Sequence, residues 1–520
     1  MNQDSLKSLM RLAAYPVQTT SVELVQTHVS WIFLTDTHAF KLKKPVDFGF
    51  LNFSTIDRRL FYCNEEVRLN RRLCPDIYEG VVTLRKTADG VAFTGEGPII
   101  DHAVMMKRLP ANRMLDKLVE SGEATVENLI NVANVISKFH AEASTSNHIS
   151  EFGSLKNIMF NWNENLQQML PYDASTLPTN ERKAIQAWVT EFADSNEELF
   201  DRRIKEGYIR ECDGDLHLEN ICLVDDKVYI FDCIEFNERF RFCDTAADIA
   251  FLLMDLDFHN RNDLSETVLT TYLEASGDQE LEKLIIFYKI YRAFVRGKVE
   301  SFCLGDKGID GEARSTAKKR ADRYFRLARG YCERTRLRPT LFITCGSMGC
   351  GKSMLADQLK FELGISVHSS DVVRKRLAGC TDETGIQELY GQGLYDNTMS
   401  ERTYEELKKF AGYELAAGRT VLIDASFKRA IDRTEFAKLA ALHKADFIIL
   451  LVTCDEDEQI MRLRRRAENS TSVSDGRVEL LDRQKAEFEY PGMGEGHIIL
   501  IDTTYSPEEL ASRIYGELNR

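Results

Sequence analysis

Residues 346–353 read GSMGCGKS and lie between an apolar segment, 340–345, and a helical pattern that starts at Lys352. The pattern GxxxxGK(S/T) between a strand and a helix is typical of a phosphate-binding loop, because the loop amides and the helix N-terminus cradle phosphates. Lys352 is expected to bridge the β- and γ-phosphates of ATP, and the Ser353 hydroxyl to ligate Mg²⁺. A bare glycine-rich turn is the alternative, which the preceding strand and the Lys-Ser pair disfavour. The other nucleotide-binding positions are Gly346, Ser347, Met348, Gly349, Cys350 and Gly351.

Strand and helix signals alternate around this loop. Strand patterns cover 340–345, 365–368, 420–424, 446–453 and 497–502, and helical patterns begin at Lys352, Asp371, Arg433 and Glu456. This alternation predicts a three-layer α/β domain with a parallel sheet. The basic segment RTRLRP ends in proline and indicates a junction. We therefore expect a P-loop domain over 336–520 and a separate domain over 1–335.

Three polar residues follow strands of the expected sheet. Asp424 ends an apolar strand in a Walker-B-like arrangement and is expected to hold the magnesium shell through water, although a strand-terminal Asp is often only a cap. Asp371 and Arg374 lie one helical turn apart at the C-terminal edge of the sheet, where ligands of open α/β sheets bind. This pair suits a base for an acceptor hydroxyl and a cation for a neighbouring anion. The alternative is an N-cap Asp beside a solvated Arg.

Four arginines crowd one predicted helix near the C-terminus, beside a polar stretch at 469–477. Such a cluster can close over a triphosphate as a lid, and Arg462 and Arg466 are its favoured members. A solvated charged face is the alternative. The cluster consists of Arg462, Arg464, Arg465 and Arg466.

Residues 346–484 resemble the polynucleotide-kinase-like and zeta-toxin-like P-loop kinases. The likeness is carried by GSMGCGKS, DVVR, VLIDASF and RLRRR with SDGR. The resemblance implies that Asp371 is the general base and Arg374 a substrate or phosphate anchor. These kinases phosphorylate hydroxyls on nucleic-acid ends, sugars, nucleotide-sugars and antibiotics, so the resemblance defines the reaction better than the acceptor.

The first 335 residues show a different order of elements. Helical spacing covers 56–73 and dominates from Asn112 onward. Strand patterns, including an early hairpin, dominate before Asn112, and short strand patterns interrupt the helical region after it. The order predicts a β-rich lobe at about 20–110 and a helical lobe at about 111–335, with a small sheet that holds polar residues. The strand patterns are 28–34, 39–44, 80–84, 102–107, 208–212, 221–224 and 228–231.

The polar loop DGDLHLEN places Asp215 five residues before Asn220, and Asp232 follows at the end of a strand pattern. A kinase catalytic loop needs a carboxylate to accept a hydroxyl proton, an amide to hold Mg²⁺, and a second carboxylate to bridge Mg²⁺ to the phosphates. The alternative is a polar hairpin with turn-forming Asp and Asn. Upstream, Lys41 lies on a predicted strand with Lys43 on the same face, and Glu66 on the next helix matches the acid that pairs with a phosphate-binding lysine.

Residues 20–330 resemble the aminoglycoside phosphotransferase family, specifically bacterial proteins in which such a domain is fused to a P-loop kinase. The likeness implies a protein-kinase-like α+β fold, with Asp215 as catalytic base, Asn220 and Asp232 as magnesium ligands, and Lys41 as the phosphate lysine. It also implies structural roles for His140 and Asp248. The stretches that carry it are FKLKKPVDFGFLNFST, CNEEVRLNRRL, GDLHLENI, IFDCIEFN and DTAADIAFLLMDLD.

Two features depart from that family's pattern. The family usually carries His before the Gly-Asp of the catalytic loop, whereas this chain has Asp213, a carboxyl group expected to perturb Asp215. The chain also lacks a GxGxxG loop, since the first hairpin turns at 35–38. Weak activity of the N-terminal domain is one expected consequence.

Composition narrows the functional class. The 520 residues are 43% hydrophobic and carry a net charge of −15, which argues against an extended grip on a nucleic-acid backbone. No apolar run reaches the length of a membrane span, and the N-terminus lacks a signal-peptide pattern. The twelve cysteines form no CxxC pair, as in a cytoplasmic enzyme with reduced thiols.

The sequence therefore predicts a bifunctional cytoplasmic phosphotransferase. Each domain is expected to use ATP and Mg²⁺ to phosphorylate a hydroxyl of a small molecule or a nucleic-acid end. One alternative is a regulatory or toxin-like protein whose N-terminal domain binds nucleotide without turnover and controls the P-loop kinase. Another is a non-enzymatic nucleotide sensor. The sequence names neither acceptor, and it defines neither coupling between the sites nor the oligomeric state.

Overall fold

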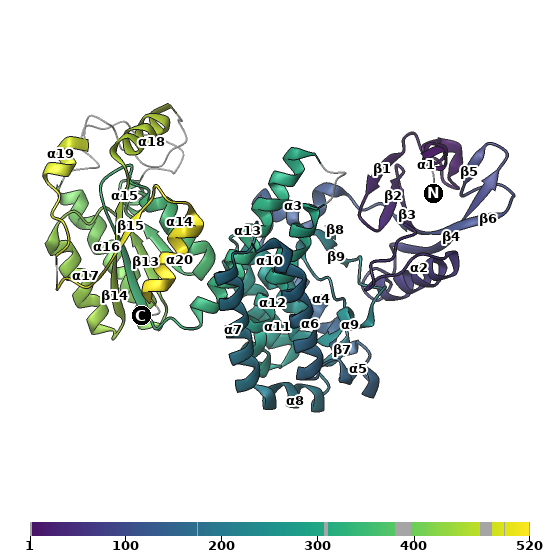
Figure 1. Ribbon diagram of the computed structural model, residues 1–520, viewed down its shortest axis with the longest axis horizontal. Coiled ribbons are helices and arrows are strands. Elements are labelled where there is room, and N and C mark those ends of the chain that lie inside the picture. Colours follow the sequence, from purple (N-terminus) through teal and green to yellow (C-terminus); the bar gives the residue numbers. More distant parts are fainter. Residues whose placement is uncertain are drawn as a thin grey trace. The chain divides into compact units, whose positions relative to one another are not determined.

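The computed structural model describes residues 3–173, 175–305, 310–379, 397–468, 481–492 and 494–518. The chain forms two compact units, Met1–Phe325 and Arg326–Arg520. The division falls inside helix α13 (Gly311–Arg334), and the boundary expected between 335 and 336 follows the end of that helix. The two units are described separately below (Figure 1).

Unit 1 begins with an antiparallel six-stranded sheet in the order β1-β2-β3-β6-β4-β5. The expected first hairpin is confirmed: β2 pairs with β3, with Phe33 opposite Phe40. The helix expected at 56–73 is α2, which ends at Asn70 and is N-capped by Thr55. The elements of this lobe are α1 (Gln3–Leu9), β1 (Glu23–Gln26), β2 (Ser30–Leu34), β3 (His38–Lys43), α2 (Ile56–Asn70), β4 (Tyr78–Thr87), β5 (Gly90–Ala92) and β6 (Ile99–Lys107).

The two faces of β3 have different partners because side chains alternate along a strand. Phe40 and Leu42 are fully buried in an apolar cluster with Tyr15 and Phe93. Lys41 and Lys43 lie on the opposite face and reach α2. The two-residue period of β3 therefore separates the core of the lobe from its charged cleft.

The helical lobe of unit 1 contains two small antiparallel sheets, where the sequence predicted one. β8 pairs with β9 as a hairpin, and β7 pairs with β10. β10 is only three residues long and lies inside a region predicted to be helical. The elements are α3 (Leu115–Glu120), α4 (Val126–Glu142), α5 (Asn147–Glu151), α6 (Leu155–Met169), α7 (Thr179–Ser195), α8 (Glu197–Lys205), β7 (Ile209–Glu211), β8 (Ile221–Val224), β9 (Lys227–Ile230), α9 (Glu238–Arg241), β10 (Phe242–Asp244), α10 (Thr245–Phe258), α11 (Asn262–Ser276), α12 (Glu282–Cys303) and α13.

Helix α10 forms the centre of the helical lobe. Every one of its residues is buried, and most of them are apolar. Its buried acids all have partners. Asp248 accepts the backbone N–H groups of Asp213 and Gly214 at 3.0 and 2.8 Å, and Asp257 pairs with Lys289 at 2.7 Å. The helix therefore both fills the core and holds the polar loop at 213–220.

Unit 2 is an α/β fold with a five-stranded parallel sheet in the order β12-β13-β11-β14-β15. The strands match the predicted segments to within a residue. Helix α16 was not predicted from the sequence. The elements are β11 (Thr340–Cys345), α14 (Lys352–Leu363), β12 (Ser366–Ser369), α15 (Ser370–Leu377), α16 (Asn397–Ala416), β13 (Val421–Asp424), α17 (Ala430–Leu442), β14 (Asp446–Thr453), α18 (Glu456–Glu468), α19 (Leu481–Ala486), β15 (His497–Asp502) and α20 (Pro507–Leu518).

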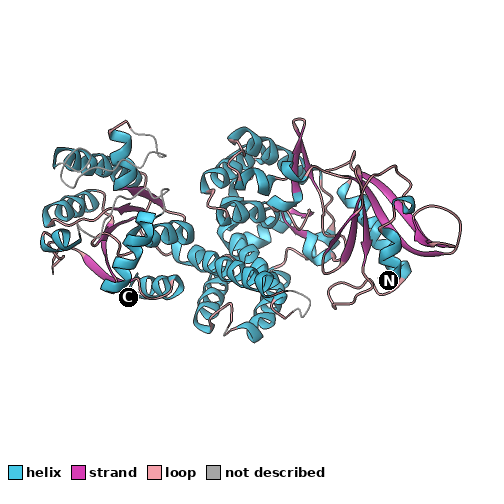
Figure 2. Ribbon diagram, turned by 90° about the horizontal axis from the view of Figure 1, so that it is seen from above, coloured by secondary structure: helices cyan, strands magenta, loops and turns pink. Residues whose placement is uncertain are grey.

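Helices cover both faces of this sheet (Figure 2). One buried cluster joins the sheet to α14 and α20, and a second joins it to α16 and α17. Because both faces are buried, β11 and β13 read as continuous apolar runs, typical of parallel strands. The connection after β11 leads to one side of the sheet and the connection after the adjacent β14 to the other, and ligands of open α/β sheets bind at such a switch point.

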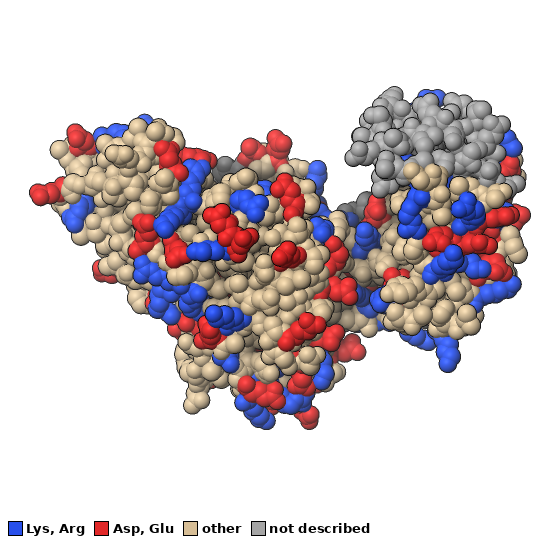
Figure 3. Space-filling model, turned by 180° about the vertical axis from the view of Figure 1, so that it is seen from behind, with Lys and Arg blue, Asp and Glu red and all other residues tan. Residues whose placement is uncertain are grey.

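Charges of both signs are interspersed over the described surface seen in Figure 3. None of the described helices is long and apolar enough to cross a membrane. The cysteines within the described ranges are free thiols, and most are buried.

One buried arginine connects three segments of the helical lobe. Arg203 of α8 is fully buried, with hydrogen bonds of 2.6–2.9 Å to Asp244 and of 2.6 Å to Asp278. Its guanidinium group also lies 3.8 Å from the centre of the Tyr208 ring. A buried charge that loses its partner is strongly destabilising.

Replacement of Arg203 should therefore destabilise unit 1. Arg203→Met leaves two buried carboxylates without their cation, and we expect a loss of about 3–5 kcal/mol in the free energy of unfolding. Urea denaturation followed by circular dichroism measures it. Arg202→Met is the matched control, because the neighbouring Arg202 is 42% exposed and pairs with Glu280 at the surface. Equal effects of the two substitutions would contradict this account.

Candidate active sites

The N-terminal site is built around a lysine that contacts two acids from distant segments. The Nζ of Lys41 on β3 lies 2.9 Å from Oε1 of Glu66 on α2 and also contacts Oδ1 of Asp232. Glu66 is fully buried, and Asp232 is 45% exposed. Three residues singled out from the sequence are therefore adjacent in the fold.

A second lysine completes this cluster, and the sequence did not assign it a role. Lys43 Nζ lies 2.6 Å from Glu66 Oε2 and contacts Glu235 Oε1. Burial alone would raise the pKa of Glu66, but the two ammonium groups lower it to about 2. Burial raises the pKa of Glu235 despite Lys43. Glu66 is therefore the firmly ionised acid shared by both lysines.

The loop after β7 brings Asp215, His217 and Asn220 together. Asn220 Nδ2 donates to Asp215 Oδ2 at 3.2 Å, and His217 Nε2 lies 3.5 Å from the same oxygen. Burial would raise the pKa of Asp215, but His217, Arg296 and Arg292 lower it. Asp215 is therefore ionised at neutral pH, the state that a general base requires.

Asp232 follows β9 in a left-handed conformation, with φ of 64°. Its N–H lies 3.3 Å from the Tyr78 hydroxyl, and the next N–H donates to Asn70 Oδ1 at 3.0 Å. The N–H of Phe231 donates to the carbonyl of Asn220 at 3.0 Å, which makes Asn220 and Asp232 neighbours across the β8–β9 hairpin. Their side chains supply carboxylate and amide oxygens, the donor types that suit Mg²⁺.

Asp213 lies where the resemblance drawn from the sequence led us to expect a histidine, and it is buried next to Asp215. Asp213 is 1% exposed, and its Oδ1 accepts the N–H of Asp215 at 3.1 Å. Burial and the nearby Asp248 raise the pKa of Asp213 well above its usual value. Asp248 is the ionised member of this pair, because hydrogen bonds from His140 and from the loop outweigh its burial and lower its pKa.

His140 and Asp248 support the loop from behind. His140 Nε2 lies 3.1 Å from Asp248 Oδ2, and Nδ1 lies 2.7 Å from the Tyr272 hydroxyl. Potential ligand atoms of His140, Asp248 and Cys212 lie within 4.8 Å of one another. Both ring nitrogens of His140 already have partners, which favours a supporting role for this cluster over metal binding.

The C-terminal site begins at the loop between β11 and α14. Gly346 lies so close to β14 that a Cβ atom would stand 2.4 Å from the Val452 carbonyl oxygen. Gly351 has φ of 96°, and a Cβ atom there would meet Thr503 at 2.9 Å. The two glycines therefore allow the backbone to wrap tightly at the start of α14.

Lys352, Ser353 and Asp424 meet at this loop. The Nζ of Lys352 donates to the Ser347 carbonyl at 2.8 Å. Asp424 accepts from Ser353 Oγ at 2.8 Å and from Thr344 Oγ1 at 3.1 Å. Burial raises the pKa of Asp424, and Lys352 opposes that shift. The hydroxyl and carboxylate oxygens again suit Mg²⁺.

Asp371 and Arg374 pair with each other at the start of α15. Arg374 Nη1 lies 2.9 Å from Asp371 Oδ1, and the Arg374 side chain is only 11% exposed. The N-cap of this helix is Ser369, which accepts the N–H of Asp371 at 3.3 Å. Asp371 also lies close enough to Asp424 to contribute to its raised pKa. The alternative of an N-cap Asp beside a solvated Arg therefore does not describe this helix.

Arg462 contacts Thr503 rather than the P-loop itself. Its guanidinium group reaches Glu458 at 2.7 Å and the Thr503 hydroxyl and carbonyl at 2.8 and 2.9 Å. Thr503 in turn donates to the Cys350 carbonyl at 2.7 Å, so Arg462 supports the loop through one residue. Arg466 lies on α18, but its side chain is outside the described part of the structure, as is the stretch 469–477 expected to belong to the lid.

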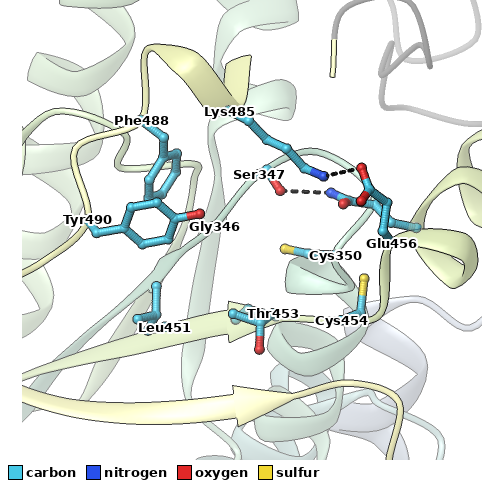
Figure 4. Close-up of a pocket in the computed structure, with 12 residues that line it drawn as sticks. Gly346, Ser347, Cys350, Leu451, Thr453, Cys454, Glu456, Lys485, Phe488 and Tyr490 are labelled. Carbon is cyan, nitrogen blue, oxygen red and sulfur yellow. Dashed lines mark hydrogen bonds and ion pairs between the residues drawn. The ribbon is translucent and has the colours of Figure 1, made fainter. Parts of the chain in front are cut away.

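A cavity of about 190 Å³ opens beside the P-loop at the C-terminal end of β14. Figure 4 shows the Phe488 and Tyr490 rings on one side and the Lys485–Glu456 ion pair, at 2.8 Å, on the other. Gln459 donates to Ser347 Oγ at 2.7 Å, and Gln484 accepts the N–H of Met348 at 2.8 Å. These two glutamines hold the loop in shape, and no local pattern in the sequence marks them.

The fold and the two sites define a protein-kinase-like unit followed by a P-loop α/β unit. A family described as "AAA domain" (AAA_33) matches residues 341–491, which contain the P-loop. "Uncharacterized protein Rv2004c" of Mycobacterium tuberculosis is 32% identical over 467 residues, which cover 89% of this chain and 90% of the relative. The chain belongs to the family of that mycobacterial protein.

Solved kinase structures are similar to separate parts of the chain. A choline/ethanolamine kinase family protein from Mesorhizobium loti is 12% identical and covers 63% of this chain and 99% of its own, with a TM-score of 0.38. A gluconokinase from Sinorhizobium meliloti 1021 is 17% identical and covers 35% of this chain and 93% of its own, with a TM-score of 0.25. These scores are low, so the fold class rests on strand order and on the geometry of the sites.

The buried Asp213 carboxyl should make the protein less stable at neutral pH than an amide would. Because the pKa of Asp213 is raised in the folded protein, folding is coupled to the uptake of a proton by this carboxyl group. This coupling lowers the free energy of unfolding at pH values above about 3.9, the pKa of an Asp in the unfolded chain, and has no effect below that pH. Asp213→Asn keeps the acceptor for the Asp215 N–H and removes this coupling. We expect urea denaturation to show a more stable variant at pH 7, with the gain shrinking as the pH falls toward 4. A gain that does not vary with pH would contradict the assignment.

The pair between His217 and Asp215 should also make the protein less stable as the pH rises, because its favourable contribution is present at low pH and is lost at high pH. Burial would lower the pKa of His217, but Asp215 raises it. The resulting stabilisation is complete below about pH 6.5 and is lost as the pH rises through the raised pKa of the folded state. The difference in unfolding free energy between wild type and His217→Gln should therefore shrink above that pH. In an Asp215→Asn background the same substitution should show no such trend.

Proposed function

We propose that this protein is an ATP-dependent phosphotransferase with two Mg-ATP sites. Each site transfers the γ-phosphate to a hydroxyl of a small molecule or a nucleic-acid end. The proposal extends the likeness to a phosphotransferase domain fused to a P-loop kinase. The observation that carries it is the contact of one lysine, Lys41, with both Glu66 and Asp232, beside a loop that holds Asp215 and Asn220.

The proposed roles in unit 1 follow from the charges of the site. Asp215, ionised at neutral pH, accepts the proton of the acceptor hydroxyl, while Asn220 holds its carboxylate in place. Lys41 binds the phosphates, and Glu66 keeps Lys41 charged and oriented. Asn220 and Asp232 would hold Mg²⁺, which when bound neutralises phosphate charge.

The proposed roles in unit 2 use the same chemistry on another fold. The amides of the P-loop and Lys352 bind phosphates, and Ser353 and Asp424 would hold Mg²⁺ directly or through water. Asp371 is the proposed base. Its present partner, Arg374, would turn to an anionic group of the acceptor or of the nucleotide.

A regulatory N-terminal domain is the second candidate, because Asp213 stands where related catalytic loops carry His. In that case unit 1 binds nucleotide and controls the P-loop kinase without transferring phosphate. Location in the cytoplasm is part of both proposals.

Two substitutions separate these candidates. Asp215→Ala and Asp371→Ala each remove a proposed base, so each should lower the rate of one transfer by about 10²–10⁴-fold and leave the other intact. The measurement incubates γ-labelled ATP and fractionated cell extract with wild-type or variant protein and compares the labelled products. Lys352→Ala is the control, and it should remove only the product that Asp371→Ala removes.

The outcomes distinguish a phosphotransferase with two active sites, a protein with a regulatory N-terminal domain and a non-enzymatic nucleotide sensor. If Asp215→Ala removes no product while unit 1 still binds ATP, the regulatory candidate replaces the first. If neither Asp215→Ala nor Lys352→Ala affects any transfer, the protein is not a phosphotransferase.

A further inference from the structure

Phenylalanine side chains from three segments gather beside the catalytic loop of unit 1. Phe48, Phe50 and Phe160 are 49%, 42% and 56% exposed, and Phe236 and Phe240 are half-buried. Single exposed apolar residues are ordinary, but a contiguous group beside a polar reactive loop is typical of a ligand site. These five residues are called the phenylalanine patch below.

The first part of the patch is the tip of a small hairpin after β3. Phe48 N–H donates to the Leu51 carbonyl at 2.9 Å, and Gly49 turns the chain with φ of 81°. The rings of Phe48 and Phe50 are stacked, with centres 6.1 Å apart. The hairpin therefore presents two aromatic rings at a tip formed by hydrogen-bonded backbone.

The second part runs alongside the catalytic loop. The rings of Phe236 and Phe240 each lie 6.3 Å from the Phe50 ring, and Asn237 Nδ2 donates to the Phe50 carbonyl at 3.0 Å. The same segment adjoins the loop itself. The N–H of Ile234 donates to the Asp213 carbonyl at 3.1 Å, and a Cβ atom on Gly214 would stand 2.8 Å from the Phe240 carbonyl. The patch thus begins at the neighbours of Asp215.

An arginine links Phe160 on α6 to the rest of the patch. The Arg239 guanidinium group lies 5.2 Å from the centre of the Phe160 ring and 5.0 Å from that of Phe240, and Glu164 binds it at 2.7 Å. The protein's own cation already takes the favourable position between these rings. The remaining aromatic surface is therefore suited to an apolar or aromatic group rather than to an ammonium ion.

We propose that the phenylalanine patch binds the aromatic ring of a small hydroxyl-bearing acceptor and directs its hydroxyl toward Asp215. This inference rests on the proposed phosphotransferase function of unit 1. It narrows the acceptor from any alcohol to an aryl alcohol. Continuity of the patch with the backbone of the catalytic loop favours a small acceptor over a protein partner.

The test uses the full chain carrying Lys352→Ala, which silences the P-loop site. 2-Phenylethanol is the probe and glycerol the comparison, since it has hydroxyls but no ring. Saturation-transfer NMR titrations without ATP give the affinities. We expect 2-phenylethanol to bind and glycerol not to compete, and we expect Phe50→Ala and Phe160→Ala each to weaken binding by about five- to tenfold, the loss typical of one aromatic contact.

Phe61→Ala is the matched control. Phe61 is 59% exposed on α2, and its ring neighbour is Tyr62, outside the patch. This substitution should leave binding unchanged, and circular dichroism melting checks that all three variants fold. Unchanged binding in Phe50→Ala and Phe160→Ala, or equal binding of glycerol, would overturn the inference.

Label transfer from γ-labelled ATP then separates the inference from the function on which it rests. Patch-dependent binding of 2-phenylethanol without transfer supports the binding site and counts against the phosphotransferase function of unit 1. If label is transferred to alcohols and the patch substitutions do not change the rate, the phosphotransferase function of unit 1 is supported and the proposed binding site is contradicted. A change in sedimentation mass on Phe50→Ala would make the patch a surface for association between chains and would overturn the inference.

Discussion

A charge that is buried away from water needs a partner, and this constraint organises the candidate site of unit 1. In unit 1, Lys41 and Lys43 lie on one face of β3, largely buried. Both contact Glu66 on α2, and Lys43 also contacts Glu235, which follows β9. Removing either side would leave a buried charge uncompensated, at a cost of several kcal/mol. The cluster therefore ties the sheet, α2 and the segment after β9 into one arrangement. The exposed Asp232 carboxylate stays within reach of a ligand at the edge of that cluster.

The same constraint applies to helix α10 and the polar loop at 213–220. The acids of α10 cannot reach water, so Asp248 and Asp255 satisfy their oxygens with backbone N–H groups of the loop, from Asp213, Gly214 and Leu218. The loop is in this way bonded to the most buried helix of the lobe. Burial and the neighbouring Asp248 raise the pKa of Asp213 well above its usual value, and Arg72 opposes that shift only in part.

The parts of this structure that the sequence predicted are those encoded locally. Two features can be recognised within a short stretch of sequence: the motif GSMGCGKS and the apolar runs of β11 and β14. A third is recognised from its known spacing, the order of Lys41, Glu66, Asp215, Asn220 and Asp232. The partners that complete the sites lie far away in the chain. Glu235, Tyr78, Gln459 and Gln484 have no pattern of their own, since their roles arise only when distant segments meet. The three-residue strand β10 was missed for a related reason, because its pairing with β7 rather than local propensity determines it.

The cations near the two proposed phosphate positions are held differently, and this affects what a nucleotide must displace. In unit 2, Lys352 donates to a neutral carbonyl of its own loop, so a phosphate would replace a weak partner with a strong one. In unit 1, Lys41 already contacts two carboxylates, and a phosphate would have to compete with Asp232 for it. A divalent cation that drew Asp232 toward Asn220 would release Lys41 for the phosphates. Under the proposed function, nucleotide affinity would therefore depend more on the metal in unit 1 than in unit 2.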